Sequence, residues 1–111
     1  MPDKREASAS PPATIIINGV TWDLKFMTKL ELFDDSELHL LGQCKNTQAQ
    51  IQIRDDIPAS KQRAVAFHEL FHAIETDAGL DLKETHVRAL AGGLFSALRA
   101  NPALAAWLLE T

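Results

Sequence analysis

The sequence has no tyrosine, a single cysteine and no long uninterrupted run of apolar residues. One cysteine cannot form an internal disulfide, so we expect a reducing compartment, namely the cytoplasm. No apolar run approaches the roughly 20 residues of a membrane-spanning helix, and the first residues lack the apolar segment of a secretory signal. The net charge is −4, whereas general nucleic-acid-binding proteins have an excess of basic residues. We therefore expect neither a membrane nor a nucleic acid as partner.

The length and composition are those of one globular domain. A chain of 111 residues, 46% of them apolar, can bury one hydrophobic core. The first residues are charged and then rich in serine, proline and alanine, a composition that favours disorder. We expect a disordered N-terminal arm over residues 1–13 and a folded domain over residues 14–111.

The most informative feature is His68-Glu69-Leu70-Phe71-His72, an H-E-x-x-H motif. Residues four apart lie on one face of an α-helix, so both imidazoles can reach one metal ion. Zn²⁺ accepts imidazole ligands and, in catalytic sites, keeps one position for water. Glu69 is placed to take a proton from that water while the metal polarises a peptide carbonyl. The motif is short, however, and also occurs in proteins without metal.

The residues around the motif predict a long, buried helix. Residues 64–74 contain no polar side chain except the two histidines and one glutamate, which is typical of a helix that is apolar nearly all round. Pro58 suits the first turn, with Asp56 or Ser60 as its cap. Gly79 suits the end, which gives a helix of about twenty residues. Burying histidines and a carboxylate is costly unless they are paired or bound to metal.

A catalytic zinc site needs a third protein ligand, and Glu84 is the best candidate. Residues 82–100 predict a second helix, on which Glu84 shares a mostly apolar stripe with Val87, Ala91 and Leu94. A carboxylate on the inward face of this helix would complete a His₂Glu site. The alternative is that Glu84 is only a first-turn acid that favours the helix dipole.

Other residues compete weakly for the third position. His86 is the rival ligand, but it lies about 200° around the helix from Glu84. Glu75 and Asp77 are less suitable, because the first helix would have to double back. Cys44 stays open as a ligand, although a buried strand position suits this cysteine better.

The middle of the chain predicts a small sheet. The predicted strands cover residues 14–17, 20–26, 38–44 and 49–54. Asn18-Gly19 is typical of a type I′ turn between the first two strands, and Lys45-Asn46-Thr47 of a turn between the last two. Polar and apolar residues alternate in residues 49–54, which indicates an exposed edge strand.

The end of the chain predicts a short last helix. Asn101 would cap this helix and Pro102 would occupy its first turn. Its apolar residues, Trp107 among them, should pack on the core, although a position near the cleft or a dimer contact is also open. We therefore expect an α+β domain, with a small, mainly antiparallel sheet against two long helices and zinc between the helices.

The motif and its surroundings resemble a known family. The arrangement H-E-L-F-H-A-I, then Gly79-Leu80, then Glu84 opening a second helix is similar to the gluzincin pattern of zinc metallopeptidases. The short chain also resembles the minigluzincins and the small HExxH metallopeptidase-like proteins of phages and prophages. Residues 51–53, residues 87–91 and Asn101-Pro102 fit the latter.

The resemblance covers residues 15–109, but only H-E-x-x-H is specific. It implies a minimal zincin-like domain in which His68, His72 and Glu84 bind zinc and Glu69 is the general base and acid. It also implies that the edge strand, here residues 49–54, binds substrate in extended form by strand addition; the alternative is an ordinary solvated strand.

Two departures from the gluzincin pattern concern catalysis. Many gluzincins have an acidic residue four positions after the ligand glutamate, where this chain has Arg88. Peptidases of this type usually stabilise the oxyanion with a tyrosine or histidine, and here His39, His86 or Arg88 would have to do so. Loss of one oxyanion donor typically costs about 10²–10³ in rate.

The sequence thus favours a zinc-dependent peptidase that acts on an extended peptide or protein segment. The first alternative is a zinc-binding regulatory or interaction module of a phage or mobile element, with weak or no peptidase activity. The second alternative is a metal-free interaction domain whose histidines are buried as hydrogen-bonded pairs. The oligomeric state is left open by the sequence.

Overall fold

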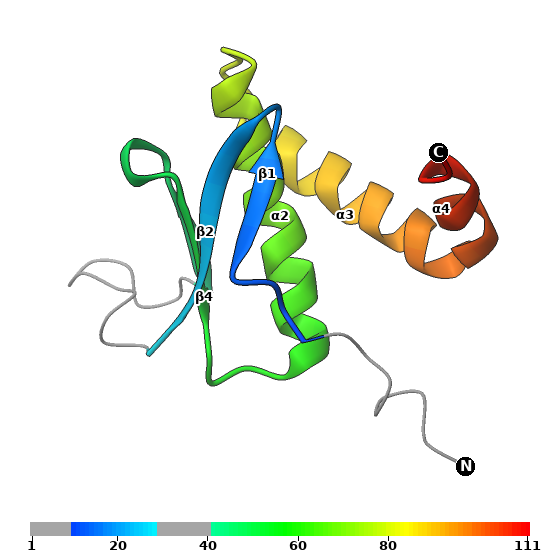
Figure 1. The fold of residues 1–111 in the computed structure, drawn as a ribbon, viewed down its shortest axis with the longest axis horizontal. Coiled ribbons are helices and arrows are strands. Elements are labelled where there is room, and N and C mark those ends of the chain that lie inside the picture. Colours follow the sequence, from blue (N-terminus) through cyan, green and yellow to red (C-terminus); the bar gives the residue numbers. More distant parts are fainter. Residues whose placement is uncertain (1–9, 29–40) are drawn as a thin grey trace.

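The structure is a computed structural model that describes residues 10–28 and 41–111. Across these residues the chain forms an α+β fold with a four-stranded mixed sheet and three α-helices, as the sequence predicted at this level (Figure 1). The strands are β1 (Thr14–Ile17), β2 (Val20–Met27), β3 (Gly42–Lys45) and β4 (Gln50–Arg54). The helices are α2 (Ala59–Asp77), α3 (Glu84–Ala100) and α4 (Pro102–Leu108).

The first hairpin follows the turn chemistry of its sequence. β1 and β2 pair antiparallel, with Ile17 opposite Val20. Asn18 and Gly19 both have positive φ, 48° and 82°, which the type I′ turn requires. Asparagine and glycine adopt this conformation more readily than other residues, so the predicted turn is confirmed.

The prediction of an exposed edge strand over residues 49–54 is wrong. The strand order is β1-β2-β4-β3, so β4 lies inside the sheet, parallel to β2 and antiparallel to β3. Its three central residues are 0–6% exposed. The glutamines of β4 alternate with apolar residues, as in a solvent-facing stripe, but they are bonded to other glutamines. Gln43 donates to Gln52 (2.6 Å) and Gln52 donates to Gln50 (3.0 Å).

β3 lies at the opposite end of the sheet from β1. Of the predicted strand over residues 38–44, the last three residues belong to β3, and residues 38–40 lie outside the described ranges. The predicted turn after it is a 3-10 helix, η1 (Asn46–Gln48), followed by Ala49 with φ 50°. β3 and β4 therefore form a hairpin, with Cys44 opposite Ile51.

The hydrophobic core lies between the sheet and α2 (Figure 1). Its buried residues are Ile17, Trp22, Ile51, Ile53 and Ala73, and Val65, Ala66 and Leu70 of α2 pack against them. The sheet thus covers one face of α2 and fixes the direction in which the opposite face points.

α2 has the predicted extent, but its cap and its burial differ from the prediction. Pro58 is at the N-cap without a side-chain cap, because Asp56 is engaged by Arg54 at 2.6 Å. Gly79, with φ 71°, follows the helix end as expected. Within α2 only Glu69 and Ala73 are buried, so the helix is covered on two sides rather than all round.

α3 covers the second side of α2. The rings of Phe67 and Phe95 lie 5.2 Å apart between the two helices. Val87 and Ala91 are buried, as the apolar stripe predicted, whereas Leu94 is 45% exposed. The C-terminal part of α3 runs away from α2 (Figure 1).

α4 does not pack on the core, contrary to the prediction for the C-terminal helix. It contacts the end of α3 and lies away from the sheet (Figure 1). No residue of α4 is buried, and Trp107 is 69% exposed. Pro102 begins the helix as predicted, but Asn101 donates to Ala97 O of α3 (2.8 Å) instead of capping α4. Among the described helices, none combines the length and apolarity needed to cross a membrane.

Candidate metal centre

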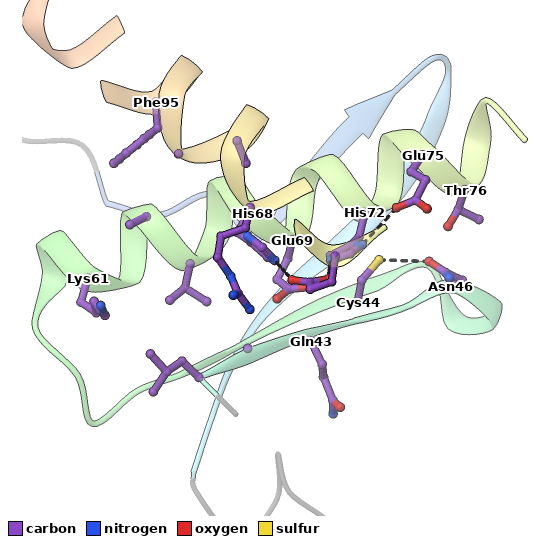
Figure 2. A pocket seen from close by; sticks show the side chains of 18 residues that line it. Gln43, Cys44, Asn46, Lys61, His68, Glu69, His72, Glu75, Thr76 and Phe95 are labelled. Carbon is purple, nitrogen blue, oxygen red and sulfur yellow. Dashed lines mark hydrogen bonds and ion pairs between the residues drawn. The ribbon is translucent and has the colours of Figure 1, made fainter. Parts of the chain in front are cut away.

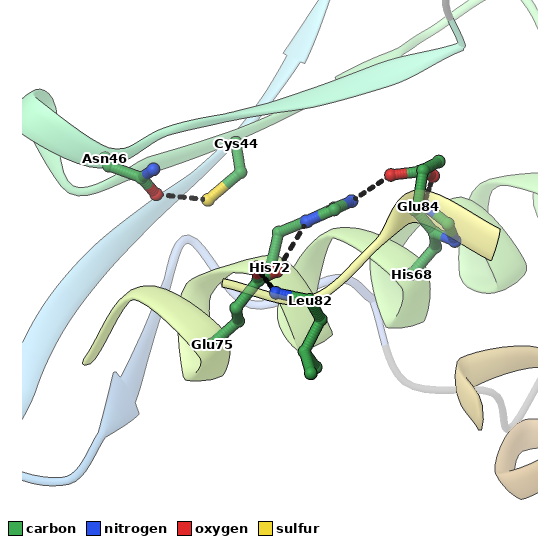
Figure 3. A network of polar contacts seen from close by, with 7 residues as sticks. All are labelled: Cys44, Asn46, His68, His72, Glu75, Leu82 and Glu84. Atoms are coloured by element: carbon green, nitrogen blue, oxygen red, sulfur yellow. Dashed lines mark hydrogen bonds and ion pairs between the residues drawn. The ribbon is translucent and has the colours of Figure 1, made fainter. Parts of the chain in front are cut away.

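The two histidines of the motif lie one turn apart on α2, with ring centroids separated by 5.0 Å. Both are about one quarter exposed and face a cleft (Figure 2). The Nε2 atoms of His68 and His72 point towards the same carboxylate, that of Glu84, at 2.7 and 3.0 Å (Figure 3). The helical spacing in the sequence therefore brings both imidazoles to one point.

Glu84 is the first residue of α3 and reaches the histidines from across the cleft. Residues 78–83 reverse the chain between the two helices and leave the beginning of α3 beside the middle of α2. One ligand atom of each of His68, His72 and Glu84 lies within 4.8 Å of the others, and this cluster could hold a metal ion. The structure brings together the three residues that the sequence singled out as ligands.

Glu69, the expected general base, lines the same cleft and is 8% exposed. Burial raises the pKa of its carboxyl group to about 7, an effect that the charge of His72 opposes and the charge of Glu84 reinforces. A carboxylate with a pKa near neutrality can both accept and return a proton at physiological pH.

The cleft has a volume of about 860 Å³ and lies between β3, α2 and α3. β3 contributes Gly42, Gln43 and Cys44, and Lys61 of α2 and Arg88 of α3 add positive charge to the walls. Arg88 is exposed and forms no ion pair with any residue in the described ranges. A cleft of this size can accommodate a peptide segment.

The rival ligands do not join the cluster. His86 is exposed and does not line the cleft, as its position around the helix predicted. Cys44 lines the cleft, but its thiol donates to Asn46 Oδ1 at 3.0 Å. Burial raises the pKa of Cys44 to about 12, with further increases from Glu69 and Glu75, so without a metal this thiol is protonated at neutral pH. His39, a candidate oxyanion donor, lies outside the described residues.

Glu75 is a residue of the centre that the sequence interpretation set aside. Its Oε1 lies 3.1 Å from His72 Nδ1, and its Oε2 accepts the backbone N–H of Leu82 at 2.7 Å (Figure 3). The sequence does indicate that Glu75 lies beside His72, because residues three apart on a helix are neighbours. As a metal ligand Glu75 points the wrong way, because its carboxylate faces His72 Nδ1 and the N–H of Leu82.

The donor set has the chemistry of a cation site. His72 has a carboxylate at each ring nitrogen, Glu75 at Nδ1 and Glu84 at Nε2. A neutral imidazole has one N–H and can donate to only one of them. The other nitrogen then turns a lone pair towards carboxylate oxygens, which is repulsive unless a proton or a metal ion lies between them. Two imidazole nitrogens and one carboxylate are ligands that Zn²⁺ accepts.

Comparison of the chain with protein-family models, with curated proteins and with solved structures gave no match.

Proposed function

We propose that this protein is a zinc-dependent peptidase with a minimal zincin-like domain. The observation that carries the proposal is the convergence of His68 Nε2, His72 Nε2 and the Glu84 carboxylate at the cleft wall, next to the buried Glu69. A His₂Glu set leaves one position of a tetrahedral metal for water, which is the arrangement of catalytic rather than structural zinc. The contacts of the Glu84 carboxylate with both histidines, at 2.7 and 3.0 Å, support its assignment as the third ligand.

The metal would be held by His68, His72 and Glu84. The proton transfers would be carried out by Glu69. A bound Zn²⁺ lowers the pKa of a coordinated water towards neutrality and polarises a carbonyl. Glu69 takes a proton from the attacking water on its carboxylate oxygen. The same carboxyl group then passes that proton to the amine nitrogen of the leaving peptide.

Arg88 takes the place of the missing tyrosine. Of the two candidate oxyanion donors within the described residues, His86 and Arg88, Arg88 lines the cleft, one helical turn after Glu84. Its guanidinium group is always charged and has several N–H donors, so it can stabilise an oxyanion that develops at the carbonyl carbon.

The substrate is a peptide or protein segment in extended form. Among the strands of the described residues, β3 lines the cleft, so the substrate lies alongside β3 rather than along residues 49–54. Backbone hydrogen bonds would give affinity to many sequences, and the side chains that line the cleft would give selectivity.

A second function is favoured by one specific feature, the complete lack of tyrosine. A centre that binds zinc without an efficient oxyanion donor would serve as a regulatory or interaction module of a phage or mobile element, with weak or no peptidase activity. Both functions require zinc, and they differ in whether Glu69 has a chemical role.

Metal content is the first test. Chelator-free wild-type protein should contain about one zinc per chain by plasma mass spectrometry. His68→Ala and His72→Ala should lose this zinc, and Glu84→Ala should retain it only weakly. His86→Ala is the matched control, a histidine of the neighbouring helix outside the cleft, and should keep wild-type metal content. A wild type that stays metal-free after zinc addition would refute the proposal.

Activity on a mixed peptide library separates the two functions. Glu69→Gln should keep its zinc and lose hydrolysis, because the amide cannot take the proton. Arg88→Ala should keep its zinc and lower kcat about 10²–10³-fold, the usual effect of removing one oxyanion donor. Equal rates for Glu69→Gln and the wild type would rule out the general-base role and leave the zinc-binding module.

A further inference from the structure

Glu75 uses both of its carboxylate oxygens within the metal centre. Oε1 contacts Nδ1 of His72, the nitrogen that faces away from the cleft-side cluster, at 3.1 Å. Oε2 accepts the backbone N–H of Leu82 at 2.7 Å. The side chain is only 12% exposed, so neither contact competes with bulk water as a surface pair would.

The contact with His72 gives Nδ1 a partner that can accept its proton. With a metal ion between Nε2 and Glu84, the proton would stay on Nδ1, where Glu75 accepts it, and the lone pair of Nε2 would be free for the metal. The contact also holds the plane of the ring, so that Nε2 points towards Glu84 at 3.0 Å. Carboxylates that bind the second nitrogen of a metal-ligating histidine have this effect in many metal sites.

The contact with Leu82 acts on a different ligand. Leu82 is two residues before Glu84, in the segment that connects α2 to α3. The same segment is tied to Glu75 by a second bond, from the N–H of Leu80 to the backbone carbonyl of Glu75 at 2.9 Å. Glu75 therefore holds the chain at the point from which Glu84 reaches the histidines (Figure 3).

We propose that Glu75 is a positioning residue that orients two of the three metal ligands, His72 through its side chain and Glu84 through the backbone of Leu82. The inference rests on the proposed metal site. Glu75 does not bind the metal, because both of its oxygens are directed at His72 Nδ1 and Leu82 N. Glu75 orders two ligands before the metal binds, so less conformational entropy is lost when the metal binds.

The test is Zn²⁺ affinity, measured by competition with a chromophoric chelator, together with the absorption spectrum of the Co²⁺-loaded protein. Glu75→Gln has nearly the same shape, but it offers a single acceptor oxygen and no charge. We expect it to bind Zn²⁺ about 10–100-fold more weakly, the usual effect of losing such a partner. Its Co²⁺ spectrum should also change, because the ligand geometry is no longer held.

Two further variants separate positioning from charge and from fold stability. Glu75→Asp keeps the charge but is one methylene too short for both contacts, so it should also lose affinity. Asp77→Asn is the matched control: Asp77 is an acid at the end of the same helix that accepts from Asn18 at 2.6 Å and does not line the cleft. This control should keep wild-type affinity and spectrum. Glu75→Asp tests the inference on its own if circular dichroism shows that Glu75→Gln is unfolded.

The outcomes distinguish this inference from the proposed function. Wild-type affinity in Glu75→Gln or in Glu75→Asp would overturn the inference while leaving the metal site intact. Loss of affinity in Asp77→Asn equal to that in Glu75→Gln would also overturn it, because the effect would then be general to acids at this helix end. A wild type that binds no Zn²⁺ would overturn the metal site itself, and the inference with it.

Discussion

Glu69 shows how position on a helix sets the chemistry of one residue. It lies one residue after His68, but its side chain is buried where β3 approaches α2, and Gly42 lies beside its Cγ. Burial removes water from the carboxylate and raises its pKa to about 7. The motif predicted a general-base role for Glu69, but the sequence did not indicate the raised pKa, because the strand that buries this residue is distant along the chain.

This burial makes the stability of the metal-free protein depend on pH. A carboxyl group with a pKa of 4.5 when unfolded and about 7 when folded contributes fully to stability below pH 4.5. That contribution is lost as the pH rises through 7, a change on the order of 3 kcal/mol. In EDTA, urea unfolding of the wild type should show this decrease relative to Glu69→Gln, which does not titrate. Glu110→Gln, a substitution of an exposed acid, should behave as the wild type, and an equal pH dependence in Glu69→Gln would contradict the assignment.

Among the elements, the contact between β3 and α2 determines the floor of the cleft. A Cβ at Gly42 would lie 2.5 Å from Val65 Cγ1 and 2.9 Å from the carbonyl oxygen of Gln52. The second neighbour is backbone, so the strand itself would have to move. Glycine at this position therefore permits the close approach that buries Glu69.

Gly42→Ala should destabilise the protein by about 1–3 kcal/mol, because the added methyl group overpacks the contact between strand and helix. Gly93→Ala is the control, since a Cβ at Gly93 meets nothing within 4 Å in the middle of α3. Better helix propensity should make that variant more stable by about 0.5–1 kcal/mol. Chemical denaturation measures both changes, and a neutral Gly42→Ala would mean that β3 can shift freely.

The elements were predictable where the signal was local. The type I′ hairpin and the extent of α2 follow from Asn18-Gly19, Pro58 and Gly79, whose conformations depend on their own neighbours. The place of β4 inside the sheet was not predictable from alternation, because glutamines that bond to each other resemble a solvated stripe. The convergence of His68, His72 and Glu84 was predictable because helical periodicity and one short connection place them, whereas the contacts of Glu75 needed the path of that connection.

At the scale of the whole molecule, the described residues form a packed core and a peripheral C-terminal helix. The sheet and α2 enclose the core, and α4 lies beyond the end of α3 with its apolar residues in contact with solvent. The prediction that α4 packs on the core was wrong because apolar residues at helical spacing indicate an apolar face, but not the surface that covers it.

The two tryptophans test this division. Trp22 is 4% exposed within the core, and Trp107 is 69% exposed on α4. Trp22→Ala should cost about 3–5 kcal/mol, the usual cost of truncating a buried aromatic side chain. Trp107→Ala should change the free energy of unfolding by no more than about 0.5 kcal/mol. A large loss in Trp107→Ala would show that α4 is covered in solution, by a second copy of the chain for example, and dilution would then lower the melting temperature.

The centre also has a consequence for the order of folding. His68 and Glu84 are 16 residues apart, whereas the parallel partners in β2 and β4 are further apart along the chain, as with Asp23 and Gln50. Contacts between near neighbours in the chain close small loops and form early. The helical pair can therefore assemble before β2 and β4 pair. A metal ion bound to that pair would accelerate folding more than it slows unfolding, which stopped-flow measurements with and without Zn²⁺ would resolve.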